Sequence, residues 1–267
     1  MKSLFLGLAL LSPAILSPGI ACAAGLTGQQ AVYNLKLEKV RTHDVTGATG
    51  QMRYDVVDGC TGWATSQHMT LLVRSVDGTL NKSVTNYTTW EAKDGKTLNF
   101  KVSETDNDGK PQVDDAGTAT RADKGGMIDY TTPADTKLAL PPGTLFPMAH
   151  TEALLAAGGE GKKFVSPTLF DGTSADGAED TFVAILGHDD HTKSSFPALN
   201  GMPSSDVDIA FFKRKHRDET PEFRTRMRYF EDGVASKLVL DFGDFIMTGK
   251  LVSLKIPPSP CGAQTAR

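Results

Sequence analysis

Apolar and polar residues alternate with a period of two along most of this chain. The alternation is clearest in three runs, YNLKLE (33–38), MRYDV (52–56) and LNFKV (98–102). Successive side chains of a β-strand point to opposite faces, so this pattern predicts strands with one buried face. Antiparallel sheets commonly bury one face and expose the other, and the pattern therefore favours an antiparallel sheet.

Turn signals separate these runs at the spacing of hairpins. Asp-Gly favours the positive φ angles that tight hairpin turns need. Such pairs occur at Asp77-Gly78, Asp94-Gly95, Asp108-Gly109, Asp171-Gly172 and Asp232-Gly233. The polar stretch 103–124 fits either a further hairpin or a flexible excursion, and strand-like runs resume from residue 164 onward.

The segment 140–161 breaks the alternation and predicts one helix. Thr144 is a candidate N-cap, Pro147 suits the first turn, and Gly158-Gly159 would end the helix. Its apolar side chains would pack on a concave sheet. The expected fold is mainly β, a curved antiparallel sheet that cups one main helix within a single domain at 24–267.

The first 23 residues have the form of an export signal. Lys2 is followed by an apolar run, and Ala21-Cys22-Ala23 matches an Ala-x-Ala cleavage site. The mature protein is therefore expected in the periplasm. An alternative stays open, because GIAC (19–22) resembles a lipobox in which Cys22 would be lipidated and retained, although Gly19 stands where that box usually has Leu.

Removal of the signal would leave two cysteines, Cys60 and Cys261, in an oxidising compartment. An even pair in such a compartment indicates a disulfide. The flanking residues of Cys60 supply no cation to activate a thiol, which argues against a catalytic cysteine. Neither cysteine lies in a CxxC or close Cys/His pair, which argues against a metal site.

The net charge of the chain limits the classes of binding partner that we expect. The formal net charge is −4, which does not favour nucleic acid or an anionic membrane as a general partner. After the signal, no apolar stretch approaches the roughly 20 residues that a membrane-spanning helix needs. No residue pattern predicts a cofactor, and the oligomeric state stays open.

The segment ILGHDDH (185–191) is one candidate for chemistry. Its side chains His188, Asp189, Asp190 and His191 could bind zinc or act as acid and base in an envelope hydrolase. The competing interpretation is a solvated polar turn. Known hydrolase signatures such as GxSxG and HExxH are absent from the sequence, which favours a binding or structural role over catalysis.

A second candidate is FRTRMRYF (223–230). As a strand it would place Arg224, Arg226 and Arg228 on one face, where guanidinium groups could bind phosphate or carboxylate head groups. The alternative is a solvent-facing strand whose arginines pair with nearby carboxylates such as Glu222 and Glu231.

Several of these features together resemble the EipB family of periplasmic proteins. They are the signal peptide, the strand that ends at Cys60-Thr-Gly-Trp63, the helix segment LPPGTLFPMAHTEALLAA, the FDGT turn (170–173) and the terminal PPSPC at 257–261. The resemblance covers almost all of the mature chain. It implies a spiral antiparallel sheet around a helix, similar to the lipoprotein carriers LolA and LolB, and a disulfide between Cys60 and Cys261.

The resemblance also implies a role in cell envelope integrity, with no established catalytic residues. We therefore expect a non-enzymatic protein whose concave β surface binds a lipid, a lipoprotein or another envelope protein. Apolar strand positions would line either the core or a cavity of that surface. They include Met52, Tyr54, Trp63, Leu98, Phe100, Met227 and Tyr229.

Overall fold

The computed structural model describes residues 25–214 and 220–261, so the predicted signal peptide lies outside the described residues. Within these ranges the chain forms one sheet of fifteen strands, the helix α1 (Pro147–Gly159) and a short 3-10 helix at Pro197–Leu199. The strands are β1 Gln29–Val40, β2 Val45–Asp58, β3 Gly62–Ser75, β4 Leu80–Ala92, β5 Thr97–Thr105, β6 Pro111–Ala122, β7 Gly125–Thr132, β8 Thr136–Leu140, β9 Phe164–Val165, β10 Thr168–Leu169, β11 Glu179–Asp189, β12 Ser204–Lys213, β13 Phe223–Phe230, β14 Ala235–Asp241 and β15 Phe245–Lys255.

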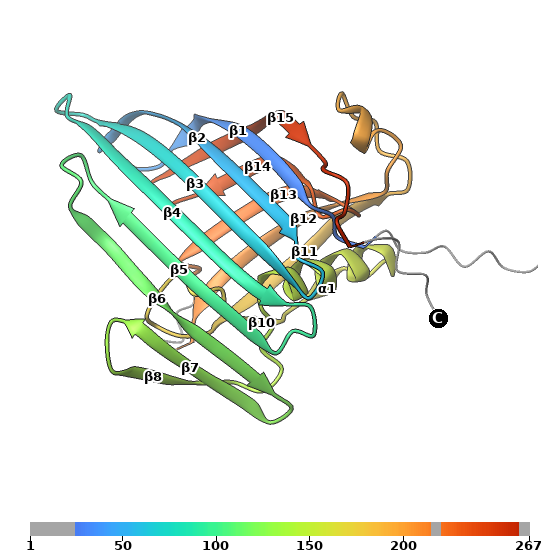
Figure 1. Cartoon of the computed structure of the whole chain (residues 1–267). Coiled ribbons are helices and arrows are strands. Elements are labelled where there is room, and N and C mark those ends of the chain that lie inside the picture. The colour runs from blue at the N-terminus through green and yellow to red at the C-terminus, as the bar shows by residue number, and fades with distance from the viewer. Residues whose placement is uncertain (1–24, 215–219, 262–267) are drawn as a thin grey trace, which may run out of the picture.

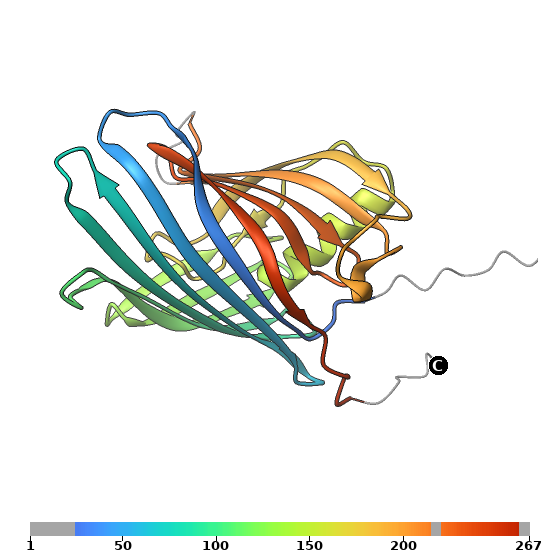
Figure 2. The same cartoon turned by 90° about the horizontal axis from the view of Figure 1, so that it is seen from above.

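The first long strand of the chain lies in the middle of the sheet. The order runs from β10 to β15, then to β1, and on through β8, with β9 paired to β11 beside this path. Antiparallel pairing joins β1 to both β15 and β2. Because neighbouring strands are twisted relative to one another, so large a sheet must curl. Figures 1 and 2 show it turning back on itself, so that β1–β6 face β11–β15 across an interior.

The prediction of a curved antiparallel sheet is confirmed. In the described part of the chain, the sheet does not close into a barrel, because its two terminal strands do not pair with each other. Its terminal strands on the main path are β8 and β10. Near them, Leu145 forms a bridge with Leu169 of β10, supported by hydrogen bonds from Leu145 N to the Thr168 carbonyl and from Phe170 N to the Leu145 carbonyl.

The glycine of every predicted Asp-Gly turn has a positive φ, between 65° and 87°. Four of these turns join consecutive long strands, while Gly172 lies in the loop between β10 and β11. A Cβ at Gly172 would lie 2.3 Å from Phe100 Cγ, so this turn needs glycine for space as well as for φ. The polar stretch 103–124 is a hairpin, because β6 pairs with β5.

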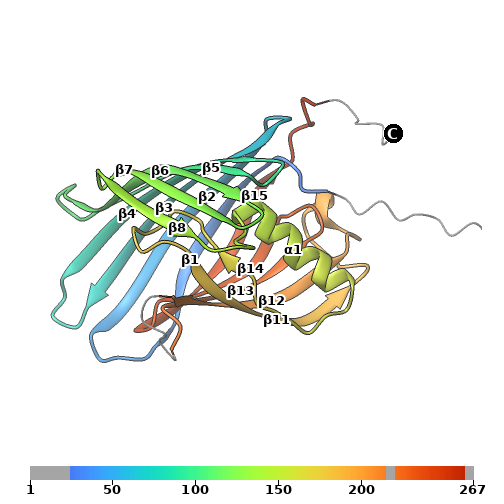
Figure 3. The same cartoon turned by 90° about the horizontal axis from the view of Figure 1, so that it is seen from below.

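Helix α1 begins at Pro147 and ends with Gly158-Gly159, as the sequence predicts. The predicted cap is wrong. Phe146 occupies the N-cap position without a capping side chain, and the Thr144 hydroxyl instead donates to the Pro141 carbonyl at 2.8 Å. Figure 3 shows α1 lying inside the curve of the sheet, beside β11 and β12.

The core is divided among several apolar clusters on the inner face of the sheet. Leu98 and Phe100 belong to one that also contains Phe146 and Phe170. Trp63 packs in another against Met148 of α1. Leu154 of α1 packs against inner residues of β11 and β12. Three of the predicted lining residues, Trp63, Leu98 and Phe100, are thus plain core.

Candidate ligand-binding site

The interior of the curved sheet contains a cavity of about 320 Å³. This volume lies within the roughly 300–1,000 Å³ typical of small-molecule sites. Strands from both halves of the sheet and α1 form its walls. The lining residues on the first half are Tyr33, Met52, Tyr54, Gln67, Met69 and Tyr87, and those on the second half are Ile209, Phe211, Phe223, Thr225, Met227, Tyr229, Ala235, Leu238, Leu240 and Phe242. Pro147, His150 and Thr151 of the helix, with Leu169 and Asp171, complete it.

The cavity wall consists largely of flexible methionine side chains and aromatic rings. Three methionines line it, and unbranched thioether side chains adapt to ligands of different shape. On the second half of the sheet, the rings of Phe211 and Phe223 lie 5.8 Å apart and those of Phe223 and Phe242 lie 5.7 Å apart. All three phenylalanines are only half-buried. The wall therefore offers apolar surface that the protein itself does not cover.

Two of the tyrosines at the cavity have their hydroxyl groups bound by backbone carbonyls of the protein itself. The Tyr33 hydroxyl donates to the Ala235 carbonyl at 2.8 Å, and the Tyr87 hydroxyl donates to the Asp171 carbonyl at 2.6 Å. Burial raises the pKa of Tyr54 and Tyr229 above the ordinary value. These hydroxyls stay protonated at any physiological pH, so the tyrosines add no charge to the cavity.

His150 is the buried titratable group that α1 contributes to the cavity. Only 5% of the residue is exposed, and its Nε2 lies 3.3 Å from the Thr181 hydroxyl. That hydroxyl donates to the Pro167 carbonyl, so Nε2 carries the proton and donates to Thr181. Burial lowers the pKa of His150 to about 4. The imidazole is therefore neutral at physiological pH.

This burial predicts acid sensitivity. The unfolded chain takes up a proton at His150 near its ordinary pKa of 6.5, whereas the folded protein does so only near 4, so stability falls as the pH drops between these values. We expect His150→Gln to gain about 3 kcal/mol relative to the wild type between pH 7 and pH 4. Urea unfolding of both proteins at pH 7 and pH 4 measures this difference in the free energy of unfolding. If the two proteins differ in free energy of unfolding by the same amount at pH 7 and pH 4, His150 is not a buried neutral imidazole in the folded protein.

The N-terminus of α1 is held from across the sheet by Glu91 of β4. Its two carboxyl oxygens accept hydrogen bonds from Met148 N at 2.7 Å and Ala149 N at 3.0 Å. Only 2% of Glu91 is exposed. Burial raises the pKa of the Glu91 carboxyl to about 7, although the two backbone donors oppose the rise. Glu91 thus fixes the helix that closes part of the cavity.

The predicted disulfide between Cys60 and Cys261 is present. It joins the turn between β2 and β3 to the tail that follows β15. Asp58 organises this junction, since its carboxylate accepts from Cys60 N at 2.9 Å and from the Ser259 hydroxyl at 3.2 Å and pairs with Lys93 at 2.6 Å. The two sulfurs are bonded to each other, so neither is available as a nucleophile or metal ligand.

The HDDH segment does not assemble into a metal site. His188, at the end of β11, lies 2.9 Å from the Ser205 hydroxyl through Nδ1 and 3.3 Å from Asp190 through Nε2. Asp189 accepts a hydrogen bond from the backbone of His191, as in an ordinary polar turn. Across the described ranges, these four side chains belong to no group of three or more potential metal ligands. The geometry favours the polar turn over the hydrolase.

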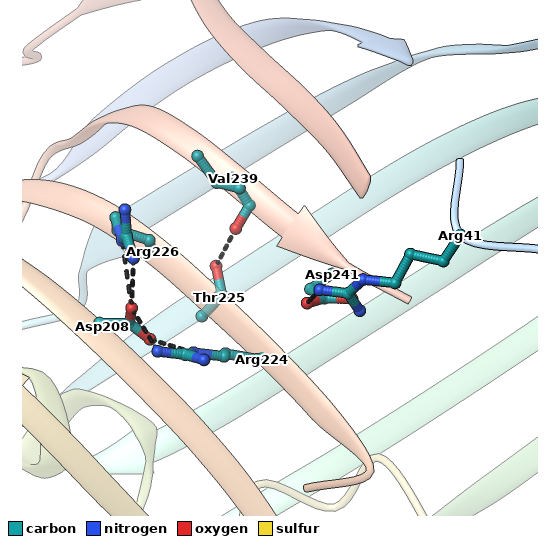
Figure 4. A network of polar contacts seen from close by, with 7 residues as sticks. All are labelled: Arg41, Asp208, Arg224, Thr225, Arg226, Val239 and Asp241. Carbon is teal, nitrogen blue, oxygen red and sulfur yellow. Dashed lines mark hydrogen bonds and ion pairs between the residues drawn. The ribbon is translucent and has the colours of Figure 1, made fainter. Parts of the chain in front are cut away.

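The three arginines of β13 lie on one face of the strand, which is the outer face of the sheet, and their carboxylate partners differ from the expected ones. Arg224 and Arg226 both bind Asp208, at 2.6 and 2.8 Å (Figure 4), and Arg228 binds Asp206 at 2.6 Å. Both aspartates lie on the neighbouring strand β12, where Asp206 is opposite Arg228 and Asp208 is opposite Arg226 in the sheet register. Glu222 and Glu231, which are close only in sequence, are not these partners.

In these ion pairs the Nε and Nη2 groups of each arginine donate to an aspartate carboxylate. Burial would raise the pKa of Asp208, but the hydrogen bonds from Arg224 and Arg226 outweigh it and the pKa lies below the usual range. Arg41 and Asp241 form a further ion pair beside them (Figure 4). The arrangement favours a paired outer surface over an anion-binding face.

Known proteins share both the sequence and the fold of this chain. The model of the EipB-like family matches residues 20–258. The cell envelope integrity protein EipB of Brucella abortus (strain 2308) is 31% identical over 244 residues, which is 88% of this chain and 86% of that protein. A crystal structure from Brucella abortus, described as a beta-barrel-like protein of a domain of unknown function, superimposes with a TM-score of 0.80 at 26% identity and covers 88% of this chain and 100% of that one. The protein therefore belongs to the EipB-like family.

Proposed function

We propose that this protein supports cell envelope integrity from the periplasm as a non-enzymatic binding protein that holds the apolar chain of a lipid or lipoprotein. The apolar cavity inside the curved sheet carries the proposal. Methionine and aromatic side chains would contact an acyl chain by shape alone, which suits a ligand without directional polar groups. The relative from Brucella abortus, named for cell envelope integrity, supports the physiological setting.

The proposed periplasmic location depends on export of the chain from the cytoplasm. The signal-like residues at 1–23 and the disulfide agree with an oxidising compartment. No helix in the described part of the chain is long and apolar enough to cross a membrane.

A neutral apolar fluorophore, N-phenyl-1-naphthylamine, tests the cavity directly. We expect the purified protein to bind it with increased fluorescence, and Met52→Trp to weaken binding about tenfold by filling the cavity. Gln51→Trp is the matched control, because Gln51 is the next residue of β2 and points to the opposite, exposed face. No binding by the wild type, or equal binding by Met52→Trp, would contradict the proposal.

Complementation of a strain that lacks the protein separates binding from catalysis. We expect Met52→Trp to restore envelope integrity poorly, and His188→Ala and His191→Ala to restore it as well as the wild type. Loss of complementation by both histidine variants, with the fluorophore still bound, would favour an enzyme instead. Native mass spectrometry of protein purified from its own periplasm would then identify what the cavity holds.

A further inference from the structure

The apolar cavity borders a second hollow of about 470 Å³. The two share wall residues from both halves of the sheet and from the loop between β10 and β11. The shared residues are Gln67, Tyr87, Asp171, Phe211 and Phe223. A ligand with its chain in the cavity can therefore place its other end in this second hollow.

The second hollow is acidic. Its lining includes the carboxyl groups of Glu104, Asp171, Glu179 and Glu222, and we call this hollow the acidic vestibule. Among residues 25–214 and 220–261, no lysine or arginine side chain lines it. Lys213 lies beside it and pairs with Glu222 at 2.8 Å. Within the part of the chain that the structure describes, the vestibule therefore holds more carboxyl groups than cationic groups.

Among the described residues, one of these carboxyl groups has no hydrogen-bond or ion-pair partner. Asp171 accepts hydrogen bonds from the backbone and side chain of Thr173, and Glu104 accepts one from Thr85. Within residues 25–214 and 220–261, the half-buried Glu179 side chain makes neither a hydrogen bond nor an ion pair. A half-buried carboxyl group without a partner is costly to ionise and is stabilised by a cation placed beside it.

We propose that the ligand of this cavity is an amphiphile whose apolar chain lies among the methionine and aromatic residues and whose polar end carries positive charge in the acidic vestibule. The inference rests on the proposed function and names the charge class of its ligand. A like-charged head group, as in a fatty acid, would meet the four carboxyl groups and be repelled. An apolar wall that ends in negative charge is complementary to a cationic amphiphile.

Two amphiphiles with the same ten-carbon chain test the charge preference. Decyltrimethylammonium and decanesulfonate are permanently charged, and calorimetry below micelle formation gives their dissociation constants. We expect the wild type to bind the cation at least about tenfold more tightly. The double variant Glu104→Gln/Glu179→Gln should bind both within about threefold. Glu38→Gln, an exposed change on the outer face, should keep the wild-type preference.

The pH dependence gives an independent measure of Glu179. Burial raises the pKa of Glu179 to about 8, with Asp171, Glu222 and Asp176 adding to the rise and Lys213 opposing it. Glu179 therefore ionises between about pH 7 and pH 9, and the affinity for decyltrimethylammonium should rise severalfold over this range. Glu179→Gln should flatten that rise, whereas Glu38→Gln should keep it.

The failures of the two proposals are distinguishable. Equal affinity for the two amphiphiles in a protein that still binds N-phenyl-1-naphthylamine would overturn the charge assignment and leave the cavity intact as a site. Tighter binding of decanesulfonate would overturn it as well. Tetramethylammonium, which lacks the chain, should bind at least about a hundredfold more weakly than decyltrimethylammonium, and comparable affinity would overturn the placement of the chain in the cavity.

Discussion

Replacement of Cys60 with serine is expected to lower the free energy of unfolding by up to about 5 kcal/mol, the chain-entropy value for a closed loop of this length. The disulfide joins residues 201 positions apart, so the closed loop contains every described strand except β1 and β2. For a protein of this size, about 5 kcal/mol corresponds to a fall in melting temperature of about 10 °C or more. Thermal and urea unfolding of oxidised wild type and variant measure the effect.

A double-mutant cycle separates the crosslink from local contacts. Cys261→Ser and the double variant should be destabilised by nearly the same amount as Cys60→Ser, because each removes the same bond. Reduction of the wild type should reproduce the loss. Cys60 also has a φ of 67°, a left-handed conformation that is strained for a residue with a Cβ. Additive losses in the cycle would show that local contacts, rather than the crosslink, carry the stability.

Replacement of Glu91 with alanine is expected to cost about 4 kcal/mol at pH 5. The change removes the acceptors for Met148 N and Ala149 N at the start of α1 and leaves an empty volume in the interior. No side chain of the N-cap Phe146 replaces them. Glu152→Ala, an exposed change on the same helix, should cost less than about 1 kcal/mol. A similar loss in both variants would show that Glu91 does not anchor the helix.

Glu91→Gln isolates the buried charge. The pKa of Glu91 is raised from 4.5 to about 7, so between these values the folded protein keeps a proton that the unfolded chain has lost, and wild-type stability falls as the pH rises. Glu91→Gln does not titrate and should resemble the wild type near pH 5. It should gain about 3 kcal/mol relative to the wild type by pH 8. A relative loss instead would mean that the site prefers the charged carboxylate.

Glu91 also shows where hydrophobic patterning fails. Trp90 and Glu91 are consecutive in β4, so their side chains point to opposite faces of the sheet. Apolarity alone predicts that Trp90 is buried and Glu91 exposed, yet Trp90 is 36% exposed and Glu91 is buried. The register of β4 against β3 decides this, because the Trp90 ring covers Gly62 on the outer face, where a Cβ would lie 2.6 Å from it. A carboxyl group at an inner strand position is the signal that could have identified the cap.

The arginine strand shows a second limit of local sequence. The alternation of side chains along a strand predicts that Arg224, Arg226 and Arg228 share one face of β13, and in the structure they do. Their partners Asp206 and Asp208 are at least sixteen positions away, because cross-strand neighbours are set by register. The acidic vestibule was missed for the same reason, since its carboxyl groups come from four separate segments.

Local chemistry was sufficient for the strands, the Asp-Gly turns, the extent of the helix and the cysteine pair, because each depends on side-chain alternation, backbone preference or the count of thiols in one compartment. Met52, Tyr54, Met227 and Tyr229 alternate just as Trp63, Leu98 and Phe100 do, yet the first four line the cavity and the last three are core. What separates them is the curl of the sheet and the position of α1. Both arise from contacts between distant strands, which no local pattern encodes.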